Sequence, residues 1–287
     1  MLPQLRNKQN KNSSPISVNT LFQLQTLFDK QGWPIDEDNT VSFFNRYIST
    51  LSILDEKQQD FLISLSHRFL YVPIERYLEL VLKPLIELRK ENPNKKLFFT
   101  CCLPKEDVGK TKSSQSVLYQ IKGTTIKSKI DLRPSRVIEI WDNTICHEFD
   151  TSNYQVVLVD DFIGTGETAL SAIKYIKDTC PNIEDSRISV LSIIAMDEGI
   201  RLITDKGHKS YVSIICKKGI TDYYNGTELS NAINLMRSIE KQIKGLSDRF
   251  SFGYNQSESL VCMNRCPNNT FPIYWKSDKS HNAPYER

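Results

Sequence analysis

The sequence has no long apolar run, few histidines and only a small excess of charge. Its longest apolar runs are far too short to cross a bilayer, and residues 1–8 contain no apolar core of a signal peptide. A formal net charge of +3 over 287 residues gives no argument for nucleic-acid binding from composition. Hydrophobic residues make up 39% of the chain and charged residues 25%, as in ordinary globular proteins. We therefore expect a cytoplasmic protein that makes no membrane contact.

Cysteine and histidine occur without the spacing of a metal site. The seven cysteines include no Cys-x-x-Cys pair. The four histidines, at positions 67, 147, 208 and 281, lie far apart in the sequence. An odd number of scattered cysteines predicts reduced, mostly buried thiols. We therefore expect no metal site built from protein ligands.

One segment, residues 156–168, combines an apolar run, two acids and a glycine-rich turn. Its sequence is VVLVDDFIGTGET. The apolar residues 156–159 are typical of a parallel strand that is covered on both faces. Gly164 and Gly166 permit a tight turn whose N–H groups surround an anion. Residues 169–177 have helical periodicity, so the positive amino end of a helix would face the same anion.

The chemistry of this segment suits a ribose 5-phosphate. Asp160 and Asp161 would hold neighbouring sugar hydroxyls, while the turn and the helix amino end would hold the phosphate. The segment is not a Walker A loop, since no lysine precedes Thr168, and only the first half of a G-x-G-x-x-G pattern is present. The alternative is an ordinary strand end with a polar turn and no ligand.

The segment resembles the phosphoribosyl-pyrophosphate (PRPP) signature of type I phosphoribosyltransferases, which is an apolar strand, two acids, two apolar residues, a small residue and Thr-Gly-x-Thr. The resemblance implies an α/β fold with a parallel sheet flanked by helices. It implies that Asp160 and Asp161 hold the ribose 2′- and 3′-hydroxyls and act in catalysis. The residues implied to bind the ribose and its 5-phosphate are Asp160, Asp161, Ile163, Gly164, Thr165, Gly166, Glu167 and Thr168. Mg²⁺ would arrive with the substrate, bound to its pyrophosphate and ribose oxygens.

A second loop, residues 103–116, is the candidate site for the pyrophosphate. In the family, the corresponding loop follows an early core strand and offers N–H groups and a basic residue. The candidate residues here are Lys105, Lys110, Lys112, Ser113 and Ser114. A solvated surface loop is the alternative. We interpret a further basic group as an exposed connection rather than a mobile flap over the site: Lys127, Lys129, Arg133 and Arg136.

The chain as a whole predicts four parts. They are a flexible tail (1–16), an N-terminal helical region (17–94), a phosphoribosyltransferase-like α/β core (95–221), and a C-terminal helix with a closing segment (222–287). Helices are expected at about 18–30, 39–50, 55–68, 73–90, 201–206 and 230–244, and strands at about 97–102, 136–141, 156–160, 188–196 and 211–216. Strands that alternate with helices are typical of a parallel sheet. We expect the three tryptophans to be core residues.

The closing segment extends the resemblance. Its runs FGY, PNNT and PIYW, together with the helical front end, resemble the phosphoribosyltransferase-like proteins of bacterial conflict elements. Some of these accompany retron reverse transcriptases as effectors of anti-phage defence. The resemblance implies a toxin-like effector that binds PRPP or a related nucleotide and acts in ribosyl transfer or N-glycosidic bond chemistry. It also implies partners, namely a reverse transcriptase with its RNA–DNA product and an accessory protein, and an oligomer is compatible with it.

Two other functions stay open. One is a housekeeping nucleobase phosphoribosyltransferase, although such enzymes are usually shorter. In addition, Gly164 stands where the branch that salvages 6-oxopurines has an acid/base aspartate. The other is a non-catalytic regulator that binds PRPP on the same fold. The acceptor and the trigger do not follow from the sequence.

Overall fold

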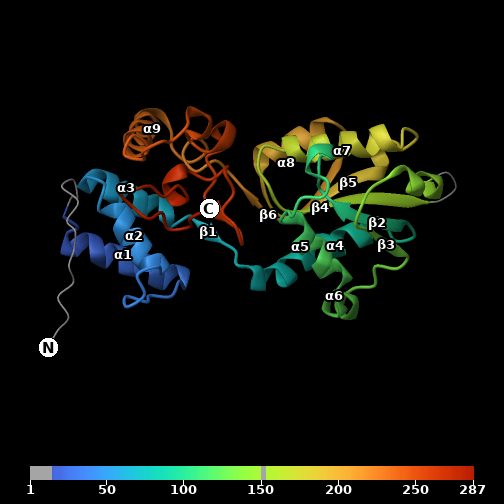
Figure 1. The fold of residues 1–287 in the computed structure, drawn as a ribbon, viewed down its shortest axis with the longest axis horizontal. Coiled ribbons are helices and arrows are strands. Elements are labelled where there is room, and N and C mark those ends of the chain that lie inside the picture. The colour runs from blue at the N-terminus through green and yellow to red at the C-terminus, as the bar shows by residue number, and fades with distance from the viewer. Residues whose placement is uncertain (1–14, 150–152) are drawn as a thin grey trace. The chain divides into compact units, whose positions relative to one another are not determined.

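The computed structural model describes residues 15–149 and 153–287 (Figure 1). The expected flexible tail therefore lies outside the described residues up to position 14. The chain divides into two compact units. We call Val72–Lys217 the sheet unit, and we call the residues before Val72 together with Lys218–Arg287 the helical unit.

The sheet unit contains a five-stranded, all-parallel sheet in the order β3-β2-β4-β5-β6. Its strands are β2 (Lys96–Cys101), β3 (Ser135–Ile138), β4 (Tyr154–Ile163), β5 (Ile188–Met196) and β6 (Lys209–Cys216). Its α-helices are α4 (Tyr77–Glu91), α5 (Ser114–Lys122), α6 (Thr124–Lys129), α7 (Glu167–Thr179) and α8 (Asp197–Asp205). Helices α7 and α8 cover one face of the sheet, and α4 and α5 cover the other (Figure 1). The predicted parallel α/β fold is confirmed.

The central strands β4 and β5 are buried because helices cover both of their faces. Every residue of β5 is buried, as its unbroken apolar run predicts. β4 is longer than expected: it continues past Asp160 to Ile163, because Ile163 still pairs with Ala195 of β5. On its other side, β4 loses its partner earlier, since the last pair with β2 joins Val159 to Cys101.

The strand order contains a point where the chain reverses direction across the sheet. From β2 the chain crosses to β3 on one side, and it then returns to β4 on the other side of β2. In doubly wound sheets, ligands bind outside the carboxyl ends of the two strands at such a point. Here these are the carboxyl ends of β2 and β4.

Helix α4 belongs to the sheet unit, whereas the sequence pattern places it in an N-terminal helical region. Its apolar stripe, including Val81, Leu85 and Leu88, is buried, and the helix contacts β5 and β6. Periodicity predicts that a helix has a buried face but not which layer that face covers. The boundary between the two units therefore lies at Val72 rather than near residue 94.

One pair of cysteines forms a disulfide, so the prediction of reduced thiols is wrong for this pair. Cys146 and Cys180 are joined, with their Cα atoms 5.4 Å apart. Cys146 lies in the 3₁₀-helix η3 (Asn143–Phe149), and Cys180 follows α7. The other five cysteines are free. Cys216 is partly buried, and the remaining four are buried, as expected: Cys101, Cys102, Cys262 and Cys266.

The helical unit is built from both ends of the described chain. Its elements are α1 (Val18–Gln31), α2 (Phe43–Leu51), α3 (Glu56–Ser66), α9 (Gly226–Glu240) and a parallel pair of short strands, β1 (Leu70–Tyr71) and β7 (Val261–Cys262). Its core is rich in aromatic rings: Phe69 stacks on Tyr285 with centroids 4.7 Å apart, and it also contacts Tyr274. The closing segment is therefore part of a core. All three tryptophans are buried, as predicted.

None of the helices in the described residues is both long enough and apolar enough to span a membrane.

Candidate functional site

The two acids of the signature lie where β4 extends beyond β2. Asp160 pairs with Ser192 of β5, but the β2 ladder ends one residue earlier, at Val159. Asp160 is partly buried, and Asp161 is only 4% exposed. The acids therefore lie at the carboxyl edge between β2 and β4, which is where ligands bind in doubly wound sheets. They lie within the strand rather than after its end.

Both carboxylate oxygens of Asp161 accept hydrogen bonds from hydroxyl groups. The Tyr77 hydroxyl donates to Oδ2 at 2.8 Å, and the Ser113 hydroxyl donates to Oδ1 at 2.6 Å. Tyr77 is the first residue of α4, and Ser113 directly precedes α5. These two bonds compensate the loss of hydration of a buried carboxylate. Nothing in the sequence distinguishes Tyr77 from the core residues of an amphipathic helix.

Asp160 and Asp161 are coupled through the backbone and through charge. The N–H of Asp161 donates to Oδ1 of Asp160 at 2.9 Å. Burial, together with the negative charge of Asp161, raises the pKa of Asp160 well above its ordinary value, and the nearby Lys112 acts in the opposite direction. The two adjacent carboxyl groups offer oxygen atoms to the hydroxyl groups of a ligand.

The turn between β4 and α7 has the geometry of an anion site. Gly166 adopts a left-handed conformation, with φ +84°, and α7 has no side-chain cap at its amino end. The first N–H groups of such a helix have no partner within the helix, and they carry its positive dipole end. Thr165 is partly buried, while Glu167 and Thr168 are exposed. The predicted strand, turn and helix of the signature are thus present in the predicted order.

The same turn packs against the first turn of α8 through glycine. A Cβ on Gly199 would lie 2.2 Å from the carbonyl oxygen of Gly164, and one on Gly166 would lie 2.8 Å from the carbonyl oxygen of Gly199. No side chain fits at either position, so the backbone of the turn packs directly against the backbone of α8, and this contact fixes the position of the turn. The sequence does not mark Gly199, because the segment after β5 lies outside the signature.

The candidate pyrophosphate loop reaches the acids through one of its five proposed residues. Ser113 bonds Asp161, as described above. Lys110 and Lys112 each lie 2.8 Å from Asp107, and their hydrogen bonds lower its pKa. Lys105 is exposed in the 3₁₀-helix η2 (Lys105–Asp107), and Ser114 is buried as the first residue of α5. Two of the three lysines of the loop, Lys110 and Lys112, are therefore paired with an acid of the loop itself.

The second basic group is exposed. Lys127 and Lys129 lie on α6, and Arg136 lies on the edge strand β3. Arg133 forms an ion pair with Asp131 at 2.9 Å. Within residues 15–149 and 153–287, no group of three or more His, Cys, Asp or Glu side chains is placed to hold a metal ion.

Comparison with known proteins identifies the family. The family model PRTase-CE matches residues 35–287, which include the whole sheet unit and the helical unit from residue 35 onward. The chain belongs to the PRTase-CE family. It is a type I phosphoribosyltransferase-like protein, as the signature predicts. A search of curated proteins found no match.

Solved structures similar to this PRTase-CE protein include two phosphoribosyltransferases. Orotate phosphoribosyltransferase from Aeropyrum pernix is 12% identical with a TM-score of 0.29, and the match covers 48% of this chain and 70% of that one. Hypoxanthine-guanine phosphoribosyltransferase from Schistosoma mansoni, in complex with IMP, is 15% identical with a TM-score of 0.31, and the match covers 51% of this chain and 65% of that one.

Proposed function

We propose that this PRTase-CE protein binds a 5-phosphorylated ribose, either PRPP or a nucleotide, at the carboxyl edge of β2 and β4. The observation that carries the proposal is the position of Asp160 and Asp161 beside the uncapped amino end of α7. The acids hold the ribose hydroxyls, and the turn at residues 164–168 holds the 5-phosphate. Mg²⁺ enters as part of a pyrophosphate-bearing substrate, and it needs few protein ligands.

The arrangement supports ribosyl transfer or cleavage of an N-glycosidic bond. Both reactions develop positive charge on the ribose ring, which a fixed carboxylate stabilises. Asp161 is held in place by Tyr77 and Ser113, so its charge is oriented before the substrate arrives. Asp160, which is partly buried in the same strand, hydrogen-bonds the ribose hydroxyls. Lys110 and Lys112 lie in the loop that would face a departing pyrophosphate, and they must exchange Asp107 for it.

Turnover is tested with PRPP and a panel of nucleobases, and separately with nucleoside monophosphates. We expect either release of pyrophosphate or release of a free base, and we expect the activity to be lost in Asp160→Leu, which has a side chain of similar size without hydrogen-bonding groups. If PRPP binds and neither product forms, the protein is a ribose-phosphate sensor, and the enzymatic part of the proposal is wrong.

We further propose that the protein is a toxin-like effector of a bacterial anti-phage defence system. The support is the family match, which extends over both the sheet unit and the helical unit rather than over the sheet unit alone. Its proposed partners are a reverse transcriptase with its RNA–DNA product and an accessory protein that restrains it until infection. A housekeeping salvage enzyme would instead restore growth to a strain that lacks nucleobase salvage.

The defence proposal is tested by expressing the chain without partners. Thr165→Tyr places a ring in the phosphate turn and removes no core volume. Thr204→Tyr places the same ring on an exposed position of α8, and it serves as the control. We expect the wild-type chain and Thr204→Tyr to slow growth and Thr165→Tyr to be inert. Equal growth of all three strains at equal protein levels would contradict the effector function.

A further inference from the structure

The loop between β2 and α5 contains a turn that brings two lysines to one acid. Val108 has φ −60° and ψ 129°, and Gly109 has φ +85°. The N–H of Lys110 donates to the carbonyl oxygen of Asp107 at 3.1 Å. These are the features of a type II turn, whose third position needs a positive φ and therefore favours glycine. The turn leads the chain back toward Asp107, so that Lys110 and Lys112 both reach its side chain.

The carboxylate of Asp107 is divided between the two lysines. Its Oδ1 lies 2.8 Å from Nζ of Lys110, and its Oδ2 lies 2.8 Å from Nζ of Lys112. The Asp107 side chain is 20% exposed, whereas the side chains of Lys110 and Lys112 are 61% and 40% exposed. An ion pair with an exposed partner changes an equilibrium by only about 1.4- to 5-fold. The lysines can therefore leave Asp107 without unfolding of the loop.

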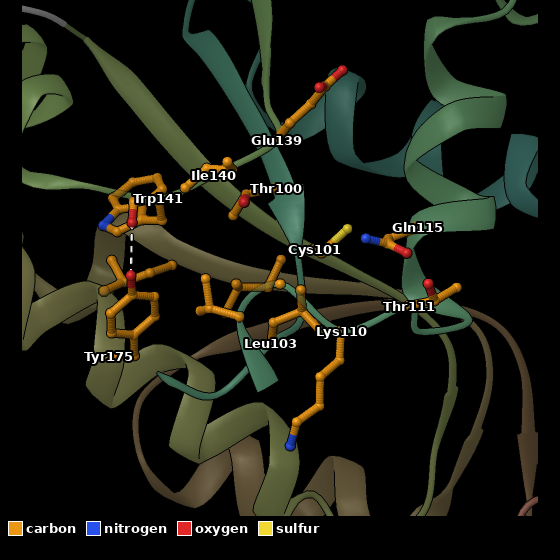
Figure 2. Close-up of a pocket in the computed structure, with 14 residues that line it drawn as sticks. Thr100, Cys101, Leu103, Lys110, Thr111, Gln115, Glu139, Ile140, Trp141 and Tyr175 are labelled. Atoms are coloured by element: carbon orange, nitrogen blue, oxygen red, sulfur yellow. Dashed lines mark hydrogen bonds between the residues drawn. The ribbon is translucent and has the colours of Figure 1, made fainter. Parts of the chain in front are cut away.

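Lys110 pairs with Asp107 rather than with an acid that lines the same cavity. The loop borders a cavity of about 310 Å³, and Figure 2 shows Lys110 and Glu139 in its lining. The Lys110 side chain extends away from Glu139 in this view, and Glu139 pairs with Lys122. The partner of Lys110 is thus the acid of its own loop.

The same loop lies beside the two acids of the signature. The positive charge of Lys112 acts on Asp160, where it opposes the rise of the pKa. The next residue, Ser113, donates its hydroxyl to Asp161. The lysines are therefore attached to the part of the loop that contacts the ribose-binding acids.

We propose that Asp107 is an internal competitor for the pyrophosphate of the substrate. Its two oxygen atoms occupy the two ammonium groups that would bind the pyrophosphate, so Lys110 and Lys112 must leave Asp107 first. A ribose 5-phosphate has no pyrophosphate and does not need them. Asp107 therefore lowers the affinity for PRPP alone, and it sets how far the site prefers PRPP over ribose 5-phosphate. The inference rests on the proposed function, because that function assigns this loop to the pyrophosphate.

Calorimetry with PRPP, inorganic pyrophosphate and ribose 5-phosphate, all at one Mg²⁺ concentration, tests the role of Asp107. Asp107→Asn keeps the shape of the side chain and removes its charge. Because two weak ion pairs are lost, this variant should bind PRPP and pyrophosphate about 2- to 30-fold more tightly than the wild type. Its affinity for ribose 5-phosphate should not change. Glu106→Gln removes the same charge from the neighbouring exposed residue, and it should change none of the three affinities, since the lysines pair with Asp107.

Removal of the lysines shows whether the gain comes through them. Lys110→Gln and Lys112→Gln, added together to Asp107→Asn, should abolish the gain. A gain that survives in this triple variant, or an equal gain in Glu106→Gln, would be a general effect of charge and would overturn the proposal. Equal affinities of the wild type and Asp107→Asn for pyrophosphate, or no binding of pyrophosphate by either, overturn it as well. Failure of ribose 5-phosphate to bind the wild type would instead contradict the proposed function, while the pyrophosphate measurement still tests Asp107.

Discussion

The hydroxyl of Tyr77 is predicted to stabilise the sheet unit through Asp161. Tyr77→Phe removes one oxygen atom and leaves the ring in place. Tyr77 is 1% exposed and Asp161 is 4% exposed, so water does not easily replace the lost 2.8 Å bond. A hydrogen bond to a charged group contributes about 1.5–3 kcal/mol. We expect a loss of that size in the free energy of unfolding of the sheet unit at neutral pH.

Ser113→Ala provides the matched comparison, because Ser113 donates to the other oxygen of the same carboxylate. Ser113 is exposed, so water takes the place of its hydroxyl. We therefore expect Ser113→Ala to cost about 0.5 kcal/mol or less. The difference between the two variants isolates the effect of burial, since the acceptor is the same.

The assay must report on the sheet unit alone, because the chain has two units that do not have to unfold together. Amide hydrogen exchange of β5 meets this need, since that strand is buried along its whole length. A loss of 1.5–3 kcal/mol corresponds to exchange that is about 10- to 150-fold faster. Exchange in Tyr77→Phe within threefold of the wild type would show that Asp161 does not depend on this hydroxyl, and the reasoning would be refuted.

Three other variants or conditions give predictions for stability. The pKa of Asp160 is raised in the folded state, so the folded state binds more protons than the unfolded state. Stability therefore falls as pH rises from the pKa of the unfolded chain, about 4, through the pKa of the folded protein. In urea unfolding, Asp160→Asn should stabilise the protein more at pH 8 than at pH 4. Gly199→Ala should destabilise the sheet unit by about 1–3 kcal/mol, because the added Cβ would lie 2.2 Å from the carbonyl oxygen of Gly164. Amide exchange of β5 as slow as in the wild type would contradict this contact. Reduction of the Cys146–Cys180 disulfide, which spans 34 residues, should lower stability by about 3–4 kcal/mol; an unchanged urea midpoint with dithiothreitol would contradict this.

Local pattern predicted the five strands and the helices α4, α7 and α8 of the sheet unit, together with the order of the signature, but it predicted neither α5 nor α6. The continuous apolar run of β5 fixed its bounds, and the change from apolar run to glycine turn to helical period located the turn before α7. These features depend on neighbouring residues only. The extension of β4 to Ile163 does not, because it depends on where β5 stops pairing.

The contacts that the sequence did not predict join distant segments. Tyr77 reaches Asp161 across 84 positions of sequence, and nothing near Tyr77 marks it as a donor. Gly199 is required only because the signature turn packs on α8. The partner of Cys146 likewise follows from the packing of η3 near the end of α7. Periodicity and motif spacing carry no information on such pairings.

The central claim is that Asp160 and the turn before α7 bind a ribose 5-phosphate. Calorimetry with PRPP and with ribose 5-phosphate tests it most directly. The account predicts that the wild type and Thr204→Tyr bind these ligands. Asp160→Leu should bind them about 5- to 150-fold more weakly, because two hydrogen bonds are lost. Thr165→Tyr should show no measurable binding. Equal affinities of the wild type, Asp160→Leu and Thr165→Tyr, or no binding of either ligand by the wild type, would contradict it.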